Sequence, residues 1–275
     1  MNSSSTAFAF EARKDSDWGD CASEYAHYSE QIGFYAGITE TLRALVPPEA
    51  ERLVDFGCGH GRFTRACLGA FTSVPNRRTV YLVDKFAEML ALTADLETMS
   101  PAIRFERVQD SEELERLSSL LRNPVDLIAC NSSLFLGRDP QAFITRATAL
   151  LKPGGSLIAN IPDQDFSFHD GWRSEFSRHA NKLLPSPSRH KIPPMFSREK
   201  LQSLAAAHGC SLELSNRFFP VPWQDFVSFY SIPFMGARRI PGVDQQHRLE
   251  HLHTMRPAFD EILYRWAFFT WTKPA

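Results

Sequence analysis

The chain has 275 residues, of which 43% are hydrophobic and 23% are charged, and its formal net charge is −2. This length allows one large domain with a sizeable core. A near-neutral charge gives no general attraction to a phosphate backbone, so we do not expect a nucleic-acid partner. No apolar run is long enough to cross a bilayer, which argues against a membrane partner.

The N-terminal residues and the cysteines indicate a cytoplasmic protein. Residues 1–6 lack the basic region followed by an apolar stretch that marks a secretory signal. The five cysteines are scattered, form no CxxC pair and cannot all close into disulfides because their number is odd. We therefore expect reduced thiols. Residues 1–17, rich in Ser and charge, are expected to form a flexible tail before one domain over residues 18–275.

The first two thirds of the chain predict alternating strands and helices. Apolar residues at helical spacing over residues 18–45 predict one or two amphipathic helices, which end at Pro47-Pro48. The predicted strands that follow are 52–56, 80–83, 103–108, 125–130 and 156–161, and the predicted helices are 62–70, 86–99, 111–121 and 140–151. A turn at residues 152–155 precedes the fifth strand. This alternation indicates an α/β fold, with a parallel sheet covered by helices on both faces.

The alternation stops after residue 162. Residues 163–195 are rich in polar, aromatic and proline residues, and a long irregular segment inside a domain tends to be functional. A helix over 197–208 with Ser197 as its cap and a strand over 211–219 follow.

The last part of the chain combines aromatic residues with helical pattern. Residues 223–263 are predicted to be mostly helical, and residues 264–272 to form the final strand. We expect residues 18–45, 163–195 and 222–263 to supply the elements of a helical cap.

A glycine-rich turn follows the first strand. Gly57, Gly59 and Gly61 would let a ligand approach the backbone, and free N–H groups of the turn and the next helix supply donors. The spacing G-x-G-x-G differs from the G-x-G-x-x-G of dinucleotide folds. Asp55 precedes the first glycine by two residues; its carboxylate would repel a pyrophosphate but attract the ammonium of an amino-acid group.

Polar residues also end the next strands. Asp84 closes the second strand, where a carboxylate can accept hydrogen bonds from both ribose hydroxyls. Gln109 and Asp110 close the third strand and could bind an adenine amino group. Asn131 closes the fourth.

Four motifs in order resemble those of class I S-adenosylmethionine-dependent methyltransferases, in particular the branch that acts on small molecules. They are Val54–Gly61, Tyr81–Asp84, Val125–Ile128 and Leu150–Leu157. The resemblance covers about residues 18–163 and, more loosely, the C-terminal strand. It implies a Rossmann-like sheet of seven strands, mostly parallel with the last antiparallel, and S-adenosylmethionine as cofactor.

The resemblance also implies roles for individual residues. Asp55, Gly57 and Gly59 would line the methionine end of the cofactor, Asp84 would bind the ribose, and the backbone of Asn131 would lie near the sulfonium. Tyr28 or Tyr25 would close over the cofactor. The full set of cofactor-binding residues expected in this way is Tyr28, Asp55, Gly57, Cys58, Gly59, Asp84, Lys85, Gln109, Asp110 and Asn131.

The class of acceptor can be narrowed by excluding methyltransferases whose motifs this sequence lacks. The segment after the fourth strand lacks the Asn/Asp-Pro-Pro-aromatic motif of enzymes that methylate DNA or glutamine amino groups, and also the paired glutamates of protein arginine methyltransferases. Metal-dependent catechol-type enzymes place acids there, which Asn131-Ser132 does not match. A small metabolite remains, and secondary metabolism is the setting that we consider for it. The aromatic segment 223–235 would suit an apolar or aromatic acceptor, although these side chains are equally well explained as cap core.

Histidines are the candidates for a general base. His169, in the segment after the fifth strand, is the first choice, and His179 and His190 are the next choices. His60 lies in the glycine turn, and its side chain could face solvent. His247 and His251 are four residues apart on a helix, but a solvated helix face explains them better than a metal site, and no metal is expected.

Three hypotheses stay open. The first is a small-molecule methyltransferase, with a homodimer as an open alternative to a monomer. The second is an RNA-base methyltransferase, which would need a basic surface. The third is a protein that binds the cofactor without transferring its methyl group.

Overall fold

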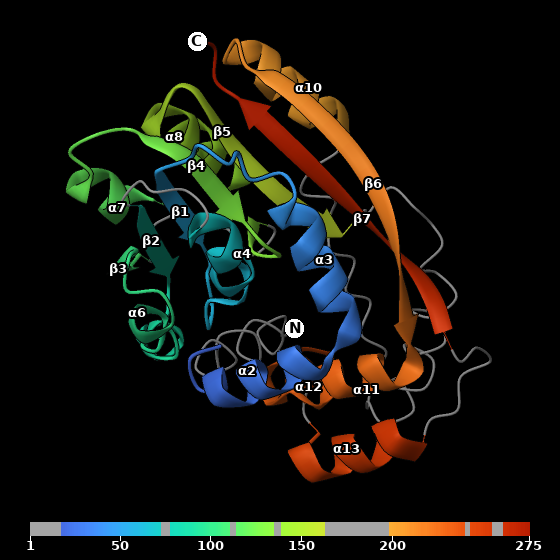
Figure 1. Cartoon of the computed structure of the whole chain (residues 1–275). Coiled ribbons are helices and arrows are strands. Elements are labelled where there is room, and N and C mark those ends of the chain that lie inside the picture. The colour runs from blue at the N-terminus through green and yellow to red at the C-terminus, as the bar shows by residue number, and fades with distance from the viewer. Residues whose placement is uncertain are drawn as a thin grey trace, which may run out of the picture.

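The computed structural model describes residues 18–72, 78–110, 114–134, 139–162, 198–239, 243–254 and 261–275. In these residues one seven-stranded sheet runs through the molecule (Figure 1). Its strands are β1 (Arg52–Phe56), β2 (Thr79–Asp84), β3 (Arg104–Gln109), β4 (Val125–Cys130), β5 (Leu151–Pro162), β6 (Ser211–Pro222) and β7 (Glu261–Thr272). Their order across the sheet is β3-β2-β1-β4-β5-β7-β6.

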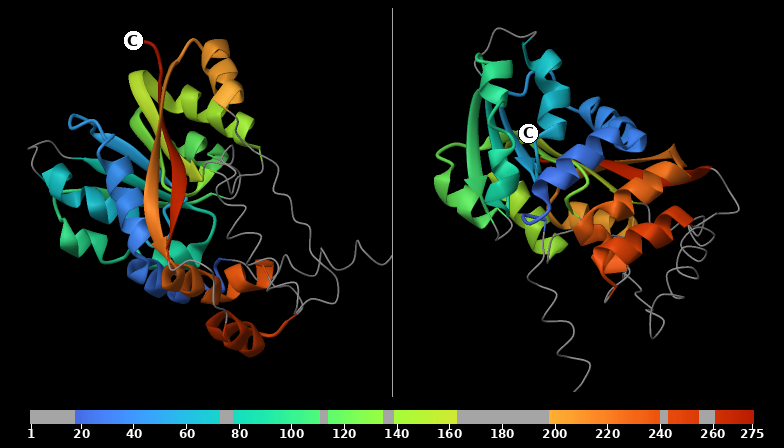
Figure 2. Two further views of the ribbon diagram at one scale, coloured as in Figure 1. Left: turned by 90° about the vertical axis from the view of Figure 1, so that its right-hand side faces the viewer. Right: turned by 90° about the horizontal axis from the view of Figure 1, so that it is seen from below.

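The strand directions confirm the expected Rossmann-like sheet. β3, β2, β1, β4 and β5 pair in parallel, and β7 is antiparallel to both β5 and β6. β6 and β7 pair along their whole length, whereas β5 pairs only with residues 266–272 of β7. The remainder of the β6–β7 ribbon therefore extends beyond the parallel part of the sheet (Figure 2).

Helices cover both faces of the sheet. The helices are α2 (Ala22–Gln31), α3 (Gly33–Arg43), α4 (Arg62–Thr72), α5 (Ala87–Ala91), α6 (Leu96–Met99), α7 (Glu115–Leu120), α8 (Pro140–Leu150), α10 (Arg198–Ala207), α11 (Trp223–Ser231), α12 (Pro233–Arg239) and α13 (Gln245–Thr254). Buried residues of α3 to α6 form one core with the sheet, and those of α7, α8 and α10 form a second core on the opposite face. None of the described helices combines the length and the apolar content that crossing a bilayer requires.

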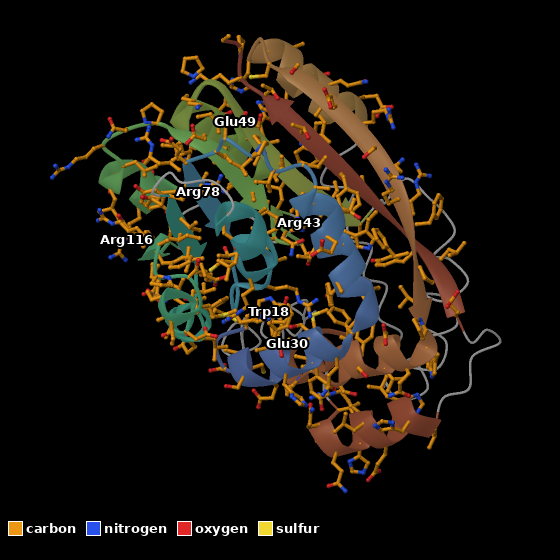
Figure 3. The ribbon with its side chains drawn as sticks, in the orientation of Figure 1. Trp18, Glu30, Arg43, Glu49, Arg78 and Arg116 are labelled. Carbon is orange, nitrogen blue, oxygen red and sulfur yellow. The ribbon has the colours of Figure 1, made fainter. Side chains whose placement is uncertain are left out.

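The helices α2, α11, α12 and α13 gather beyond the carboxyl ends of the parallel strands and form the cap (Figures 1 and 2). Trp18 lies where α2 meets α12 (Figure 3), with its ring centroid 4.8 Å from that of Phe234. Asp225 of α11 accepts a hydrogen bond of 3.0 Å from the backbone N–H of Gly33, the first residue of α3. The two outer predicted cap segments thus come together, while residues 163–195 lie outside the described residues.

The predicted single helix over 86–99 is wrong: it is divided into α5 and α6. Side chains from neighbouring elements bind the carbonyl groups between the two helices. Arg65 of α4 donates to the carbonyl of Leu92 at 3.1 Å, and Arg107 of β3 donates to that of Thr93 at 2.7 Å. Carbonyls engaged in this way satisfy their hydrogen-bonding needs without continuing the helix.

Two further boundaries also differ from the prediction. The predicted turn at 152–155 is part of β5, because Gly154 and Gly155 exchange backbone hydrogen bonds with Lys273 at 3.1 and 3.0 Å. Residues 261–263 belong to β7 rather than to the helical region, because they pair with the end of β6. Both differences depend on partners far away in the chain: Gly154 and Lys273 are 119 residues apart, and Pro222 and Glu261 are 39 residues apart. Local pattern does not reveal such partners.

Candidate functional site

The glycine turn after β1 requires glycine for its shape. Gly57, Gly59 and Gly61 have φ angles of 65°, 54° and 84°, in the left-handed region that other residues adopt only at a cost. Space is also limited at the first of them. A Cβ atom added to Gly57 would lie 2.4 Å from the Cβ atom of Ser133, in the segment that follows β4.

The end of β2 holds this turn in place. The backbone N–H groups of Gly57 and Cys58 donate to the carbonyl of Val83 at 2.8 and 3.0 Å. The Asp84 carboxylate accepts hydrogen bonds from the backbone N–H of Gly59 at 2.8 Å and from that of Phe86 at 3.0 Å. Burial raises the pKa of Asp84, and the hydrogen bonds from the two amides oppose this shift. Asp84 therefore fixes the turn as well as closing its strand.

Asp55 is a buried carboxyl group beneath the same turn. One oxygen, Oδ2, accepts a hydrogen bond of 2.7 Å from the Thr64 hydroxyl. The other, Oδ1, is buried and has no hydrogen-bond partner among the described residues. Burial raises the pKa of Asp55 to about 7, against the lowering effect of the bonds from Thr64. An incoming ammonium group would favour the ionised form, so the site fits the amino-acid part of S-adenosylmethionine.

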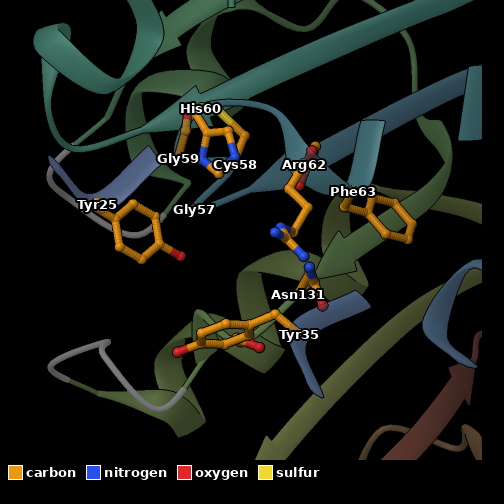
Figure 4. Close-up of a pocket in the computed structure, with 11 residues that line it drawn as sticks. Tyr25, Tyr35, Gly57, Cys58, Gly59, His60, Arg62, Phe63 and Asn131 are labelled. Atoms are coloured by element: carbon orange, nitrogen blue, oxygen red, sulfur yellow. Dashed lines mark hydrogen bonds between the residues drawn. The ribbon is translucent and has the colours of Figure 1, made fainter. Parts of the chain in front are cut away.

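A recess with about 370 Å³ of empty space, open to solvent, lies between the turn, the first two helices and the end of β4 (Figure 4). The residues that line it are Tyr25, Tyr35, Asp55, Gly57, Cys58, Gly59, His60, Arg62, Phe63, Asn131 and Ser132. Gly59 leaves its backbone open on this side: a Cβ atom there would meet only the ring of Tyr25, at 3.6 Å. The side-chain-free backbone and the two tyrosines suit a flat, polar ligand.

The floor of the recess at the end of β4 is held by side-chain amides. Asn131 donates to the hydroxyl of Thr39 at 3.1 Å and accepts from the amide of Asn160 at 2.8 Å. The oxygen of the Asn160 amide accepts from the backbone N–H of Ser132 at 2.7 Å. Ser132 has a φ of 58°, which this bond helps to stabilise. The network links the middle of α3 to the residues that follow β4 and to the last part of β5.

The structure brings several predicted site residues together. Asp55, Gly57, Cys58, Gly59 and Asn131 all line the recess. Of the two tyrosines offered for closing over it, Tyr25 lines it, whereas Tyr28 is not among the lining residues and contacts the ring of His27 at 5.6 Å.

The other predicted residues lie beyond the lining. Lys85 is exposed, with its ammonium 5.0 Å from the centre of the Phe86 ring. The Gln109 side chain donates to the carbonyl of Lys85 at 3.2 Å. Asp110 is buried and accepts a hydrogen bond of 3.0 Å from the backbone N–H of Leu117 in α7. Their part in binding the adenosine half stays a prediction.

Sequence reasoning missed Tyr35 and Arg62 as lining residues and misjudged His60. Tyr35 fits the apolar spacing of a helix, so it could be recognised only as a packing residue. Arg62 directly follows the third glycine, a position that could have drawn attention to it. His60 does not face solvent: its side chain is 5% exposed, and burial lowers its pKa to about 4. It is therefore neutral at neutral pH.

The cap aromatics lie behind the recess rather than in its lining. Trp18 contacts Tyr25 with ring centroids 4.9 Å apart, and Phe229 of α11 contacts Tyr35 at 6.1 Å. These contacts connect the cap to the two tyrosines of the recess. Phe229 and Phe234 are half-buried and are not among the residues that line this recess, so an acceptor lined by the aromatic segment 223–235 stays a prediction.

The remaining candidates are the histidines named outside the glycine turn. His169, His179 and His190 lie outside the described residues. His247 is exposed and bonds Asp244 at 2.6 Å. In the part of the chain that the structure describes, no three His, Cys, Asp or Glu side chains gather in a way that could hold a metal ion.

The family model and the two curated relatives that follow are all methyltransferases. A family model described as a methyltransferase domain matches residues 25–215. The chain is 24% identical over 164 residues to a malonyl-[acyl-carrier protein] O-methyltransferase of Halalkalibacterium halodurans, covering 54% of this chain and 58% of the relative. It is 34% identical over 125 residues to a trans-aconitate 2-methyltransferase of Variovorax paradoxus, covering 45% and 44%. The chain thus spans about half the length of the curated relatives it matches.

Solved structures share the fold. The YcgJ protein of Bacillus subtilis has a TM-score of 0.51 at 15% identity, covering 86% of this chain and 98% of that one. A plantazolicin methyltransferase solved with a substrate analogue and S-adenosylhomocysteine (SAH) has a TM-score of 0.51 at 13% identity, covering 97% and 98%. At these identities the likeness concerns the arrangement of the elements.

Proposed function

This chain belongs to the methyltransferase-domain family, among the class I enzymes that use S-adenosylmethionine, and we propose that it transfers the methyl group of this cofactor to a small-molecule acceptor. The observation that carries the proposal is the glycine turn. Its backbone is held by Asp84, and the unpartnered oxygen of the buried Asp55 lies beneath it. These features suit a ligand that carries both a nucleoside and an ammonium group.

The residues of the recess would bind and orient the reactants. When bound, the cofactor supplies a methyl group already activated on a sulfonium. Asp55 would face the ammonium group, Asn131 would fix the floor below the reacting end, and Tyr25 and Tyr35 would exclude water from it. Holding the two reactants in line is the main contribution that a protein makes to such a displacement.

The acceptor is a small molecule that we propose to be apolar or aromatic, with the methylated atom being O, N or C. The tyrosine faces of the recess support this class. The names of the two curated relatives add two acidic candidates, a malonyl group carried on an acyl-carrier protein and trans-aconitate. His169 stays our candidate for the general base of a hydroxyl acceptor.

Two further observations support a proposal on the cellular location of the protein and the kind of metabolism in which it acts. Five free cysteines, four of them buried, suit the reducing cytoplasm. The similarity in fold to a plantazolicin methyltransferase makes secondary metabolism a suitable place to look for acceptors. A homodimer is proposed as one assembly to test by light scattering.

Calorimetry with S-adenosylmethionine and SAH tests the cofactor assignment. We expect the wild type to bind both and Asp84→Ala to lose about tenfold or more in affinity, because Gly59 and Phe86 lose their acceptor. Asp95→Ala is the matched control, since Asp95 pairs with Arg65 on the surface, away from the recess. Absence of binding by the wild type, or equal affinities in all three proteins, would refute the assignment.

Turnover separates methyl transfer from the alternatives. Formation of SAH with a panel of small acids, phenols and amines is expected. Binding without turnover over the whole panel would favour a non-methylating cofactor-binding protein. Binding of RNA that weakens steeply with salt would favour the RNA-base methyltransferase.

A further inference from the structure

Arg62 occupies a distinctive place in the recess. It is the first residue of α4, directly after the glycine turn, and its guanidinium points toward Asn131 and Tyr35 (Figure 4). The guanidinium carbon lies 5.9 Å from the centre of the Tyr35 ring. Partial burial lowers the pKa of Arg62, but an arginine stays charged at neutral pH. The recess therefore holds a cation that is partly removed from water.

The hydrogen bonds of this guanidinium are incomplete. Its Nη2 donates to the backbone carbonyl of Ser29 in α2, while its Nε is buried and has no partner among the described residues. No carboxylate of the described chain forms an ion pair with it. A guanidinium has five N–H donors, so several remain for a ligand.

Two other arginines near the same helix show the usual arrangement. Arg65, one turn further along α4, binds both oxygens of Asp95, each at 2.6 Å. Arg107 binds both oxygens of Glu97, at 2.5 and 2.8 Å. A partly buried charge is costly when it is not paired. Arg62 thus differs from its neighbours in lacking a carboxylate within the described chain, and it is the one that faces the recess.

The two tyrosines make the surroundings of Arg62 favourable for an anion. Burial raises the pKa of Tyr25, and that of Tyr35 even further, so both phenols keep their protons at neutral pH. The hydroxyl of Tyr25 points into the recess (Figure 4). Neutral phenols can donate hydrogen bonds to an anion and add no negative charge that would compete with it.

We propose that Arg62 binds a carboxylate in this recess. A carboxylate matches the planar pair of donors of a guanidinium and would supply the missing counter-charge. This inference rests on the proposed function, because two ligands of a methyltransferase could carry the group. One is the amino-acid end of the cofactor, and the other is an acidic acceptor. With Asp55 beneath the turn and Arg62 beside it, the recess offers complementary partners for both charges of an amino acid.

The first arm of the test measures the carboxylate of the cofactor. Calorimetry compares SAH with its decarboxylated counterpart on the wild type, Arg62→Gln, Arg62→Lys and Arg65→Gln. The wild type should prefer SAH by about tenfold or more, the strength of a charge-assisted pair. Arg62→Gln should lose this preference, Arg62→Lys should keep part of it, and the control Arg65→Gln should keep all of it. Affinity for the decarboxylated compound should hardly change.

The second arm measures the carboxylate of an acceptor. Protein saturated with SAH is titrated with trans-aconitate as a probe acid. Binding that Arg62→Gln abolishes, together with an unchanged preference for SAH, assigns the carboxylate to the acceptor and also supports the proposal. If neither arm differs between wild type and Arg62→Gln, the proposal is overturned.

Separate controls test folding and cofactor binding. Circular dichroism and thermal melting show whether each variant is folded. If Arg62→Gln does not fold, Arg62→Lys is used in its place, because lysine keeps the charge but not the planar donor pair. A wild type that binds SAH while Arg62 has no influence refutes only this inference. A wild type that does not bind SAH refutes the proposed function, and this inference with it.

Discussion

The two halves of the molecule use different kinds of interaction. The turn half consists of β1 to β4 with the helices between them, and the ribbon half consists of β5, β6 and β7 with the cap helices. In the turn half, the site is built from backbone at the ends of short parallel strands and from buried carboxylates. In the ribbon half, long antiparallel pairing and aromatic contacts dominate.

This difference shows how the enzyme can separate two tasks. The turn half holds groups whose positions are fixed within a few residues of each strand, which suits binding one unchanging cofactor. The ribbon half reaches the recess through Asn160 of β5, which bonds Asn131 and Ser132, and through the cap. There, α11 contacts Tyr35 through Phe229, and α12 contacts Tyr25 through Trp18. Changes in the cap can therefore reshape the wall of the recess while the glycine turn stays the same.

The largest expected effect compares two glycines, one from each half. Gly57→Ala should destabilise the protein by about 3 kcal/mol or more, because it adds a steric overlap with Ser133 to the cost of a positive φ. Gly154→Ala, with φ 74° and no atom within 4 Å, should cost only about 1 kcal/mol. Urea unfolding measures both. Equal losses in the free energy of unfolding would mean that Ser133 can move away from the added Cβ atom and that the turn is less tightly packed than the structure indicates.

The second prediction concerns pH and belongs to the turn half. The pKa of Asp55 in the folded protein, about 7, exceeds its usual value of 3.8. Ionisation therefore opposes folding: the stabilisation present below pH 4 is lost as pH rises through 7. Melting of ligand-free wild type should show this loss, and Asp55→Asn should not.

Cofactor binding should have the opposite pH dependence at this residue. Because a bound ammonium group favours ionised Asp55, affinity for SAH should rise by up to about tenfold per pH unit between pH 5.5 and 7, with release of a proton. Calorimetry in buffers of different ionisation enthalpy measures that proton. If Asp55→Asn binds SAH with the same pH dependence as the wild type, Asp55 does not face the ammonium.

The smallest expected effect links the cap to the recess. Asp225→Ala removes the acceptor for the first N–H of α3, two residues before Tyr35, and should cost about 1 kcal/mol. Asp139→Ala removes the cap of α8, which accepts from Gln141 and Ala142, and should cost a similar amount. Only Asp225→Ala should also weaken SAH binding by a few-fold. A similar weakening in Asp139→Ala would show that general destabilisation, and not the cap contact, is responsible.

The strands of the turn half could be predicted because each is a short apolar segment closed by a characteristic polar residue. The predicted bounds of β4 match the structure to the residue, and Asp55, Gly57, Gly59 and Asn131 lie around one recess. The division of helix 86–99 could not be predicted, since it depends on Arg65 and Arg107 reaching carbonyls from other elements. The choice of Tyr25 over Tyr28 depends on how α2 is rotated about its axis, which its neighbours decide.

By itself, the sequence determined the alternation of strands and helices and the glycine turn, because these follow from spacing that can be read within one strand and its next helix. Only the tertiary structure decided the position of Asp84 against Gly59, the tyrosine walls, and the place of Arg62 without a carboxylate partner among the described residues. The physical reason is that a counter-charge or a hydrogen-bond acceptor acts over a few ångströms, whatever the separation along the chain. The turn thus indicates the methyl donor, and the folded cap and recess decide what else can bind beside it.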